Sequence, residues 1–156
     1  GQFSGTCALV GDAAHAVVPF YGQGMNAAFE DCTVLNECIT ADDDWEAAYD
    51  MYSRLRVANG QAIADMAVDN YFEMRDRVGD PNWRFRKQIE HKLEKAFPEL
   101  YVSRYEMVSF TRTPYAEALR RGGINDEILH ALAATTTDVE QLDFQLAEKI
   151  IREKLG

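Results

Sequence analysis

The segment Gly11–Asn26, written GDAAHAVVPFYGQGMN, carries the residues of this sequence best suited to chemistry. Asp12 follows an apolar run and a glycine, so its carboxylate could accept hydrogen bonds from a hydroxylated ligand. Gly22 and Gly24 would let the backbone approach a flat ligand closely. A helix that begins near Met25 would direct its unpaired N–H groups and its positive end into the same space. A delocalised anion would be stabilised there.

The same segment has a structural interpretation as well. An ordinary Asx-type turn at Asp12, with glycines that only tighten the loop, would give the same spacing, and physical reasoning alone leaves both interpretations open. The stretch Gly22–Ala27 (GQGMNA) also fits the dinucleotide fingerprint G-x-G-x-x-[GA], with Asp42 as its acid. Context opposes that fingerprint, because residues 12–21 separate it from the preceding strand and no β run leads to Asp42.

A second candidate site lies further along the chain. Asn70, Glu73 and Met74 stand at i, i+3 and i+4, so they share one helix face. Asn70 follows the apolar Met66 by four residues, which places this face inward. An inward Asn and Glu need polar partners; a bound amino acid could supply them, and so could water or a helix cap.

These residues must be positioned by a mostly helical α+β fold. Residues 6–10 (TCALV), closed by a Gly-Asp turn, are typical of one buried strand in a parallel sheet, and the sheet that this strand needs is not in the sequence. Residues 104–111 favour β structure. Gly60 weakens the longest helix midway. Helices are predicted from about residue 25 to 39 and over 45–78, 83–97, 114–122 (closed by Gly122-Gly123), 124–134 and 138–155.

Composition excludes several classes of function. The 156 residues carry a net charge of −10, from 16 basic and 26 acidic side chains, which repels nucleic acid and anionic membranes. The cysteines and histidines show no metal-ligand or disulfide spacing, so no metal site is predicted, and His15 is interpreted as a loop-packing residue rather than a base. No apolar run predicts a membrane anchor and no signal peptide opens the chain, which favours a cytoplasmic protein.

Residues 9–31, LVGDAAHAVVPFYGQGMNAAFED, resemble the second flavin-contact motif of the class A FAD-dependent aromatic hydroxylases. The resemblance implies the C-terminal part of an FAD/NAD(P)-binding α/β fold of the p-hydroxybenzoate hydroxylase type. Residues 1–40 would end the FAD-binding domain, and residues 41–156 would form the long helix and a helical region that contributes to the substrate pocket. By resemblance, the GD pair Gly11-Asp12 contacts the ribityl portion of FAD, and the isoalloxazine is contacted by Pro19, Gly22, Gln23, Gly24, Met25 and Asn26.

Three further stretches resemble the members of this family that hydroxylate L-kynurenine in tryptophan degradation: residues 20–26, 70–75 and 104–112, the last followed by Pro114-Tyr115. This implies that NADPH reduces FAD and that O2 then forms a flavin C4a-hydroperoxide, which hydroxylates the substrate to 3-hydroxykynurenine. The cofactor performs this chemistry, so no catalytic residue is assigned. By resemblance, the residues that bind substrate are Phe20, Asn70, Glu73, Met74 and Tyr105.

The resemblance also implies a partner, the N-terminal remainder of the same enzyme with its phosphate-binding glycines. Without it, these residues are expected to bind FAD poorly and to be inactive. Two alternatives stay open. One is another aromatic hydroxylase of the same class, for instance one acting on a phenol. The other is a free-standing helical interaction module without catalysis.

Overall fold

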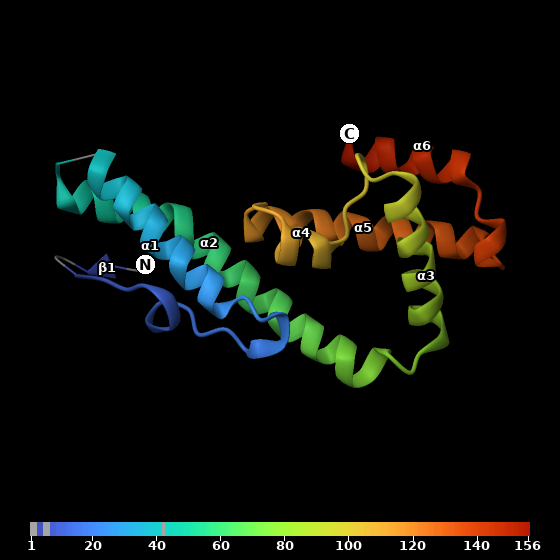
Figure 1. The fold of residues 1–156 in the computed structure, drawn as a ribbon, viewed down its shortest axis with the longest axis horizontal. Coiled ribbons are helices and arrows are strands. Elements are labelled where there is room, and N and C mark those ends of the chain that lie inside the picture. Colours follow the sequence, from blue (N-terminus) through green and yellow to red (C-terminus); the bar gives the residue numbers. More distant parts are fainter. Residues whose placement is uncertain (1–2, 5–6, 42) are drawn as a thin grey trace. The chain divides into compact units, whose positions relative to one another are not determined.

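The computed structural model describes residues 3–4, 7–41 and 43–156 (Figure 1). The predictions that involve Thr6 and Asp42 therefore lie outside the described residues. The chain divides into two compact units. The N-terminal unit comprises residues 1–71 with 114–116, and the C-terminal unit comprises residues 72–113 with 117–156. The boundary between domains predicted at residue 40 stays a prediction.

The N-terminal unit begins with two short strands, β1 (Phe3–Ser4) and β2 (Cys7–Ala8), which pair antiparallel. Residues 7–8 of the strand predicted over 6–10 form β2, but this strand is shorter than expected, pairs antiparallel rather than parallel, and is not buried. Cys7 is exposed, and Leu9 just beyond it is 49% exposed. The physical reason is that, among the described residues, β2 pairs with β1 alone, so no wider sheet covers it.

Two long helices, α1 (Gly24–Ala41) and α2 (Trp45–Phe72), lie side by side in this unit (Figure 1). Both were predicted. A small buried cluster of Cys38, Ala48 and Tyr52 joins them near the end of α1. The hydroxyl of Tyr52 donates to the carbonyl of Leu9 at 3.0 Å, which fixes the chain that leaves β2. Between β2 and α1 lie two single 3-10 turns, η1 (Gly11–Ala13) and η2 (Pro19–Tyr21).

The C-terminal unit begins with Phe72 and a π-helical turn, η3 (Glu73–Arg77), which ends one residue before the predicted end of the long helix. It is followed by α3 (Pro81–Ala96), α4 (Arg104–Phe110), α5 (Tyr115–Thr135), η4 (Val139–Gln141) and α6 (Phe144–Leu155). Pro81 occupies the first turn of α3, and the carboxylate of Asp80 caps it by accepting from Asn82 N–H. The core of the unit is formed by Ile89, Leu93, Tyr101, Ile128, Leu129, Leu132, Leu142, Ala147 and Ile151.

Two predicted elements in this unit are wrong. Residues 104–110 form helix α4 and not β structure, because Ser103 Oγ caps the helix by accepting from Glu106 N–H at 3.3 Å. The pair Gly122-Gly123 does not end a helix, since α5 runs through it. Gly122 serves packing instead: a Cβ there would collide with the side chain of Arg104.

Within the described ranges, no helix is both long enough and apolar enough to span a membrane.

Candidate functional site

The turn that carries Asp12, residues 11–15, is closed on itself and is called the Asp12 turn below. Gly11 has a φ of +58°, in the left-handed region that favours glycine. The backbone N–H groups of Ala14 and His15 both donate to the Gly11 carbonyl, at 2.8 and 2.9 Å. The Asp12 side chain is exposed, and no residue in the described part of the chain is its hydrogen-bond partner. Its carboxylate is therefore available to an external donor.

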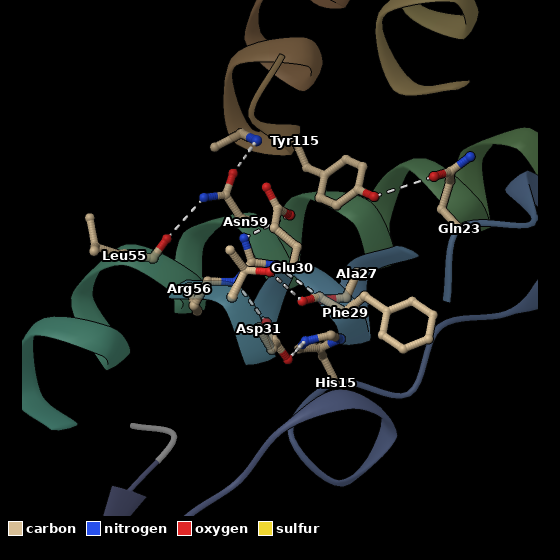
Figure 2. Close-up of polar contacts among 12 residues, drawn as sticks. His15, Gln23, Ala27, Phe29, Glu30, Asp31, Leu55, Arg56, Asn59 and Tyr115 are labelled. Carbon is tan, nitrogen blue, oxygen red and sulfur yellow. Dashed lines mark hydrogen bonds and ion pairs between the residues drawn. The ribbon is translucent and has the colours of Figure 1, made fainter. Parts of the chain in front are cut away.

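Beneath this turn lies the carboxylate of Asp31, which is 0% exposed in the middle of α1. It accepts from Gly11 N–H at 2.8 Å. It also accepts from His15 Nε2 at 2.6 Å and from Arg56 Nε at 2.6 Å (Figure 2). A buried carboxylate is costly unless it is paired with a charge and hydrogen-bonded. Asp31 satisfies both conditions with three donors, two from the Asp12 turn and one from α2.

Arg56 reaches this carboxylate from α2 and is 2% exposed. Its Nη1 lies 2.8 Å from Glu30 Oε2, and its Nη2 donates to the carbonyl of Ala27 at 3.4 Å. Burial alone would lower the pKa of Arg56, but the hydrogen bond to Asp31 and the charges of Glu30 and Asp31 raise that pKa above its ordinary value. Arg56 therefore remains a cation that fixes α2 against the first half of α1.

The imidazole of His15 fills a space against α2. A Cβ added to Gly60 would lie 3.0 Å from His15 Cδ2, so the ring would have to shift if a larger residue replaced this glycine. The His15 side chain is 7% exposed, and its Nδ1 is buried with no hydrogen-bond partner in the described ranges. The ring therefore packs against α2 and also bonds to Asp31, and the interpretation of His15 as a packing residue rather than a base stays a prediction.

The second part of the site is the segment Pro19–Asn26, called the glycine loop below, whose last three residues begin α1. Gly22 has a φ of +67°, and a Cβ at either Gly22 or Gly24 would have no atom within 4 Å. Open space therefore borders the backbone here. Met25, the second residue of α1, is 69% exposed. The first turn of α1 contains no acidic residue, so its unpaired N–H groups and positive end are not neutralised from within the helix.

Gln23 is the buried residue of the glycine loop, at 7% exposure. Its Oε1 accepts from Asn26 Nδ2 at 2.9 Å. It also accepts from the Tyr115 hydroxyl at 3.3 Å (Figure 2). Burial raises the pKa of Tyr115, so this hydroxyl stays protonated. The next residue, Ala116, donates its backbone N–H to Asn59 Oδ1 at 3.0 Å. A segment 92 residues away in sequence thus fixes the glycine loop.

Two of the predicted substrate residues meet in the N-terminal unit. Asn70 Nδ2 donates to the Phe20 carbonyl at 2.8 Å, and the Phe20 ring centroid lies 4.8 Å from that of Tyr71. The polar partner that Asn70 required is therefore the backbone of the glycine loop.

The other three predicted substrate residues belong to the C-terminal unit. The carboxylate of Glu73 accepts from Trp83 Nε1 at 3.4 Å. Met74 is 48% exposed and Tyr105 is 56% exposed, the latter with its ring centroid 6.0 Å from that of Phe110. The structure therefore groups Phe20 with Asn70 and does not join them to Glu73, Met74 and Tyr105 in one unit.

Sequence reasoning missed the pair Asp31 and Arg56, although a signal was present. Asp31 follows Ala27 by four residues and precedes Cys38 by seven, so it lies on the buried stripe of α1. Arg56 likewise follows the buried Tyr52 by four residues on α2. An acid and a base on the apolar stripes of two consecutive helices indicate a buried ion pair.

The arrangement fits the FAD that the resemblance implies. A flat ring needs space beside the backbone, which Gly22 and Gly24 leave open. Ribityl hydroxyls need an acceptor, and the Asp12 carboxylate is exposed. A reduced flavin carries negative charge at N1–C2=O, which the positive end of α1 would stabilise. Within the described ranges, no cluster of three or more His, Cys, Asp or Glu could hold a metal ion.

Comparison with known proteins agrees with this geometry. Residues 3–67 match the family described as FAD binding domain. The chain is 47% identical to a kynurenine 3-monooxygenase of Myxococcus xanthus over 151 residues, which is 97% of this chain and 32% of the relative. It is 46% identical to the enzyme of that name from Dictyostelium discoideum, over 99% of this chain and 37% of the relative. A third, from Stenotrophomonas maltophilia, is 43% identical over 97% of this chain and 33% of the relative.

The chain spans about a third of the length of these curated relatives, and the likeness covers both of its compact units. Its candidate cofactor residues all fall within the stretch that matches an FAD binding domain. Over nearly its whole length, the chain is therefore homologous to one part of the kynurenine 3-monooxygenases, a family of FAD-dependent flavoprotein monooxygenases.

Proposed function

We propose that the native protein containing these residues hydroxylates L-kynurenine to 3-hydroxykynurenine, with FAD as cofactor, NADPH as reductant and O2 as co-substrate. The observation that carries the proposal is the extent of the likeness, 42–47% identity over 93–99% of this chain in the relatives from M. xanthus, D. discoideum, S. maltophilia and Legionella pneumophila. A likeness confined to the FAD motif would support only a flavoprotein; here it extends through α3 to α6.

When FAD is bound, it supplies the redox chemistry, and the protein supplies binding, orientation and exclusion of water. Gly11 and Asp12 would hold the ribityl chain, with the Asp12 carboxylate accepting from its hydroxyls. The isoalloxazine would lie along the glycine loop, in contact with Pro19, Gly22, Gln23, Gly24, Met25 and Asn26. The positive end of α1 would stabilise the charge of the reduced ring.

The substrate residues divide into two roles. Asn70 donates to the Phe20 carbonyl, so it would hold Phe20 in place and could offer its Oδ1 to the ammonium group of an amino acid. Glu73, Met74 and Tyr105 are proposed as pocket residues because of the resemblance. The further partner is the remainder of the same enzyme. Support for it comes from the relatives, about two thirds of whose length this chain does not match.

The test is turnover by the purified native protein. We expect NADPH oxidation that depends on kynurenine, with 3-hydroxykynurenine identified by chromatography and no comparable turnover of a panel of phenols. Preferred turnover of a phenol would show that the protein is another aromatic hydroxylase of the same class, with a substrate other than kynurenine. A protein that neither retains flavin nor oxidises NADPH would instead support the interaction module.

Substitution of Asp12 tests the cofactor assignment separately. Asp12→Ala removes a charged acceptor, and we expect the Kd for FAD to rise about 10- to 100-fold, as measured by quenching of flavin fluorescence. Asp43→Ala, which removes another exposed acid, is the matched control and should leave that Kd unchanged. Equal effects of the two substitutions would contradict a role for Asp12 in binding.

A further inference from the structure

Asp31 is the most unusual residue of the N-terminal unit, since acidic side chains are almost never fully buried without a reason. Its pair with Arg56 is weak evidence for stability, because well-packed apolar residues often replace a buried ion pair at no cost. The reason for this pair is therefore better sought in the geometry that it imposes on its neighbours.

The carboxylate of Asp31 holds both ends of the Asp12 turn. At the first end it accepts from the backbone N–H of Gly11, and at the last end from the side chain of His15. Gly11 lies against α1 as well, because a Cβ there would come within 3.1 Å of Ala28 Cβ. Between these fixed ends, Asp12 carries the one polar side chain, which is exposed and has no partner in the described ranges.

The partner of Asp31 connects this turn to the other half of the site. Arg56 bonds to Asp31 at 2.6 Å and also reaches the carbonyl of Ala27, which lies in the first turn of α1 just beyond the glycine loop. The Asp12 turn and the start of α1 are thus linked through one buried ion pair (Figure 2). All of these residues belong to the N-terminal unit.

We propose that Asp31, held by Arg56 and His15, is a positioning residue that sets Asp12 relative to the start of α1. It thereby sets the distance between the groups that bind the ribityl chain and those that bind the flavin ring. The inference rests on FAD as the ligand of this site. Asp31 itself does not touch the cofactor, and it acts through Asp12 and the Gly11 peptide.

The test is a double-mutant cycle on FAD affinity in the native protein. Asp31→Asn keeps the size of the side chain, but it replaces one carboxylate oxygen with an NH₂ group. That group is a donor and would face the donors of Gly11, His15 or Arg56. We expect the Kd for FAD to rise about 10-fold or more. If Asp31 acts through Asp12, the double variant Asp31→Asn/Asp12→Ala should bind FAD no more weakly than Asp12→Ala alone.

A readout without cofactor distinguishes positioning from general stability. In the FAD-free protein, Asp31→Asn should speed hydrogen exchange at the peptide containing Gly11, while exchange in α3 and α5 stays unchanged. The matched control is Asp50→Asn, which removes an exposed acid paired with Arg54 on α2 and should change neither measurement. If Asp31→Asn does not fold, Arg56→Lys serves instead, because it keeps the charge and loses the forked hydrogen bonds.

The possible outcomes separate the two proposals. If Asp12→Ala leaves FAD affinity unchanged, the proposed cofactor site is wrong. If Asp12→Ala weakens binding but the effects of Asp31→Asn and Asp12→Ala multiply, Asp31 is only a structural residue and the further inference is overturned. Uniform acceleration of exchange throughout the chain would overturn it as well.

Discussion

The two compact units bury different kinds of side chain. The C-terminal unit packs mainly aliphatic residues from α3, α5 and α6, with Leu93, Ile128 and Leu132 each 1% exposed or less. The N-terminal unit also buries apolar residues, among them Ile63 and Met66, but it buries with them the ion pair of Asp31 and Arg56. It also leaves large apolar side chains of α1 exposed, with Met25 at 69% and Phe29 at 64%.

This difference separates stability from positioning. Aliphatic burial contributes about 25 cal/mol for each Å² removed from water, wherever in the core it occurs. A buried ion pair contributes little net free energy, but it has one favourable geometry. We infer that the C-terminal unit mainly supplies stability, while the N-terminal unit holds ligand-binding groups at defined positions. The four predictions below test that division.

The largest effect is expected from Leu132→Ala in the C-terminal unit. The substitution leaves a cavity in the aliphatic core, which should lower the free energy of unfolding by about 2–5 kcal/mol, measured by denaturant titration of the native protein. The Kd for FAD should change far less. The control is Leu55→Ala on α2, where the side chain is 46% exposed and the cost should be within about 0.5 kcal/mol. Comparable losses of unfolding free energy in the two variants would contradict the role of the aliphatic core in stability.

A pH-dependent effect is expected from Tyr52 in the N-terminal unit. Burial, followed by the negative charge of Asp31, raises the pKa of Tyr52 from 10.0 to about 12. The folded protein holds this proton more tightly than the unfolded chain does. The resulting stability is therefore fully present below pH 10 and is lost as the pH rises to about 12.

The measurement is the difference in free energy of unfolding between wild type and Tyr52→Phe across this pH range. Below pH 10 the wild type should be more stable, because it keeps the hydrogen bond to Leu9. That advantage should shrink as the pH approaches 12. A constant difference would show that the hydroxyl of Tyr52 titrates normally.

A smaller effect is expected from Tyr115→Phe, which removes the hydroxyl that donates to Gln23. Loss of one hydrogen bond should cost about 1 kcal/mol of stability. Because Gln23 lies in the glycine loop, the Kd for FAD should rise several-fold as well. Tyr101→Phe is the same change in the C-terminal unit, where the hydroxyl lies 3.5 Å from Glu90, and it should leave FAD affinity unchanged. Equal effects on FAD would contradict the assignment of positioning to one unit.

The smallest effect is expected from the two adjacent glycines of α5. Gly123→Ala meets no atom within 4 Å, so it should raise the free energy of unfolding by roughly 0.5–1 kcal/mol through helix propensity. Gly122→Ala must displace Arg104 and should be less stable than Gly123→Ala. Identical behaviour of the two variants would contradict the packing role of Gly122.

The features that were predictable from sequence are those fixed by neighbours in the chain. The end of the long helix and the start of α3 follow from Gly79 and Pro81, whose backbone restrictions act locally. The start of α1 was predictable within one residue. Asp12 and Gly22 could be proposed as site residues because their residue types and spacing suit flavin binding, whatever the fold around them.

The features that were missed depend on distant contacts. Tyr105, Val108 and Phe110 favour a strand locally, and only the cap of α4 and the burial of Met107 and Val108 decide for a helix. The bond from Arg56 to Asp31 spans 25 residues and that from Tyr115 to Gln23 spans 92. No local pattern determines which partners such residues select.

The close contact between Gly60 and His15 has a consequence for how this sequence can vary. In isolation, alanine at position 60 would favour α2, yet its methyl group would lie 3.0 Å from the ring of His15, which would have to move. The effects of substitutions at positions 15 and 60 on stability should therefore depend on each other. A mutant library that varies both positions together would include combinations that single substitutions miss.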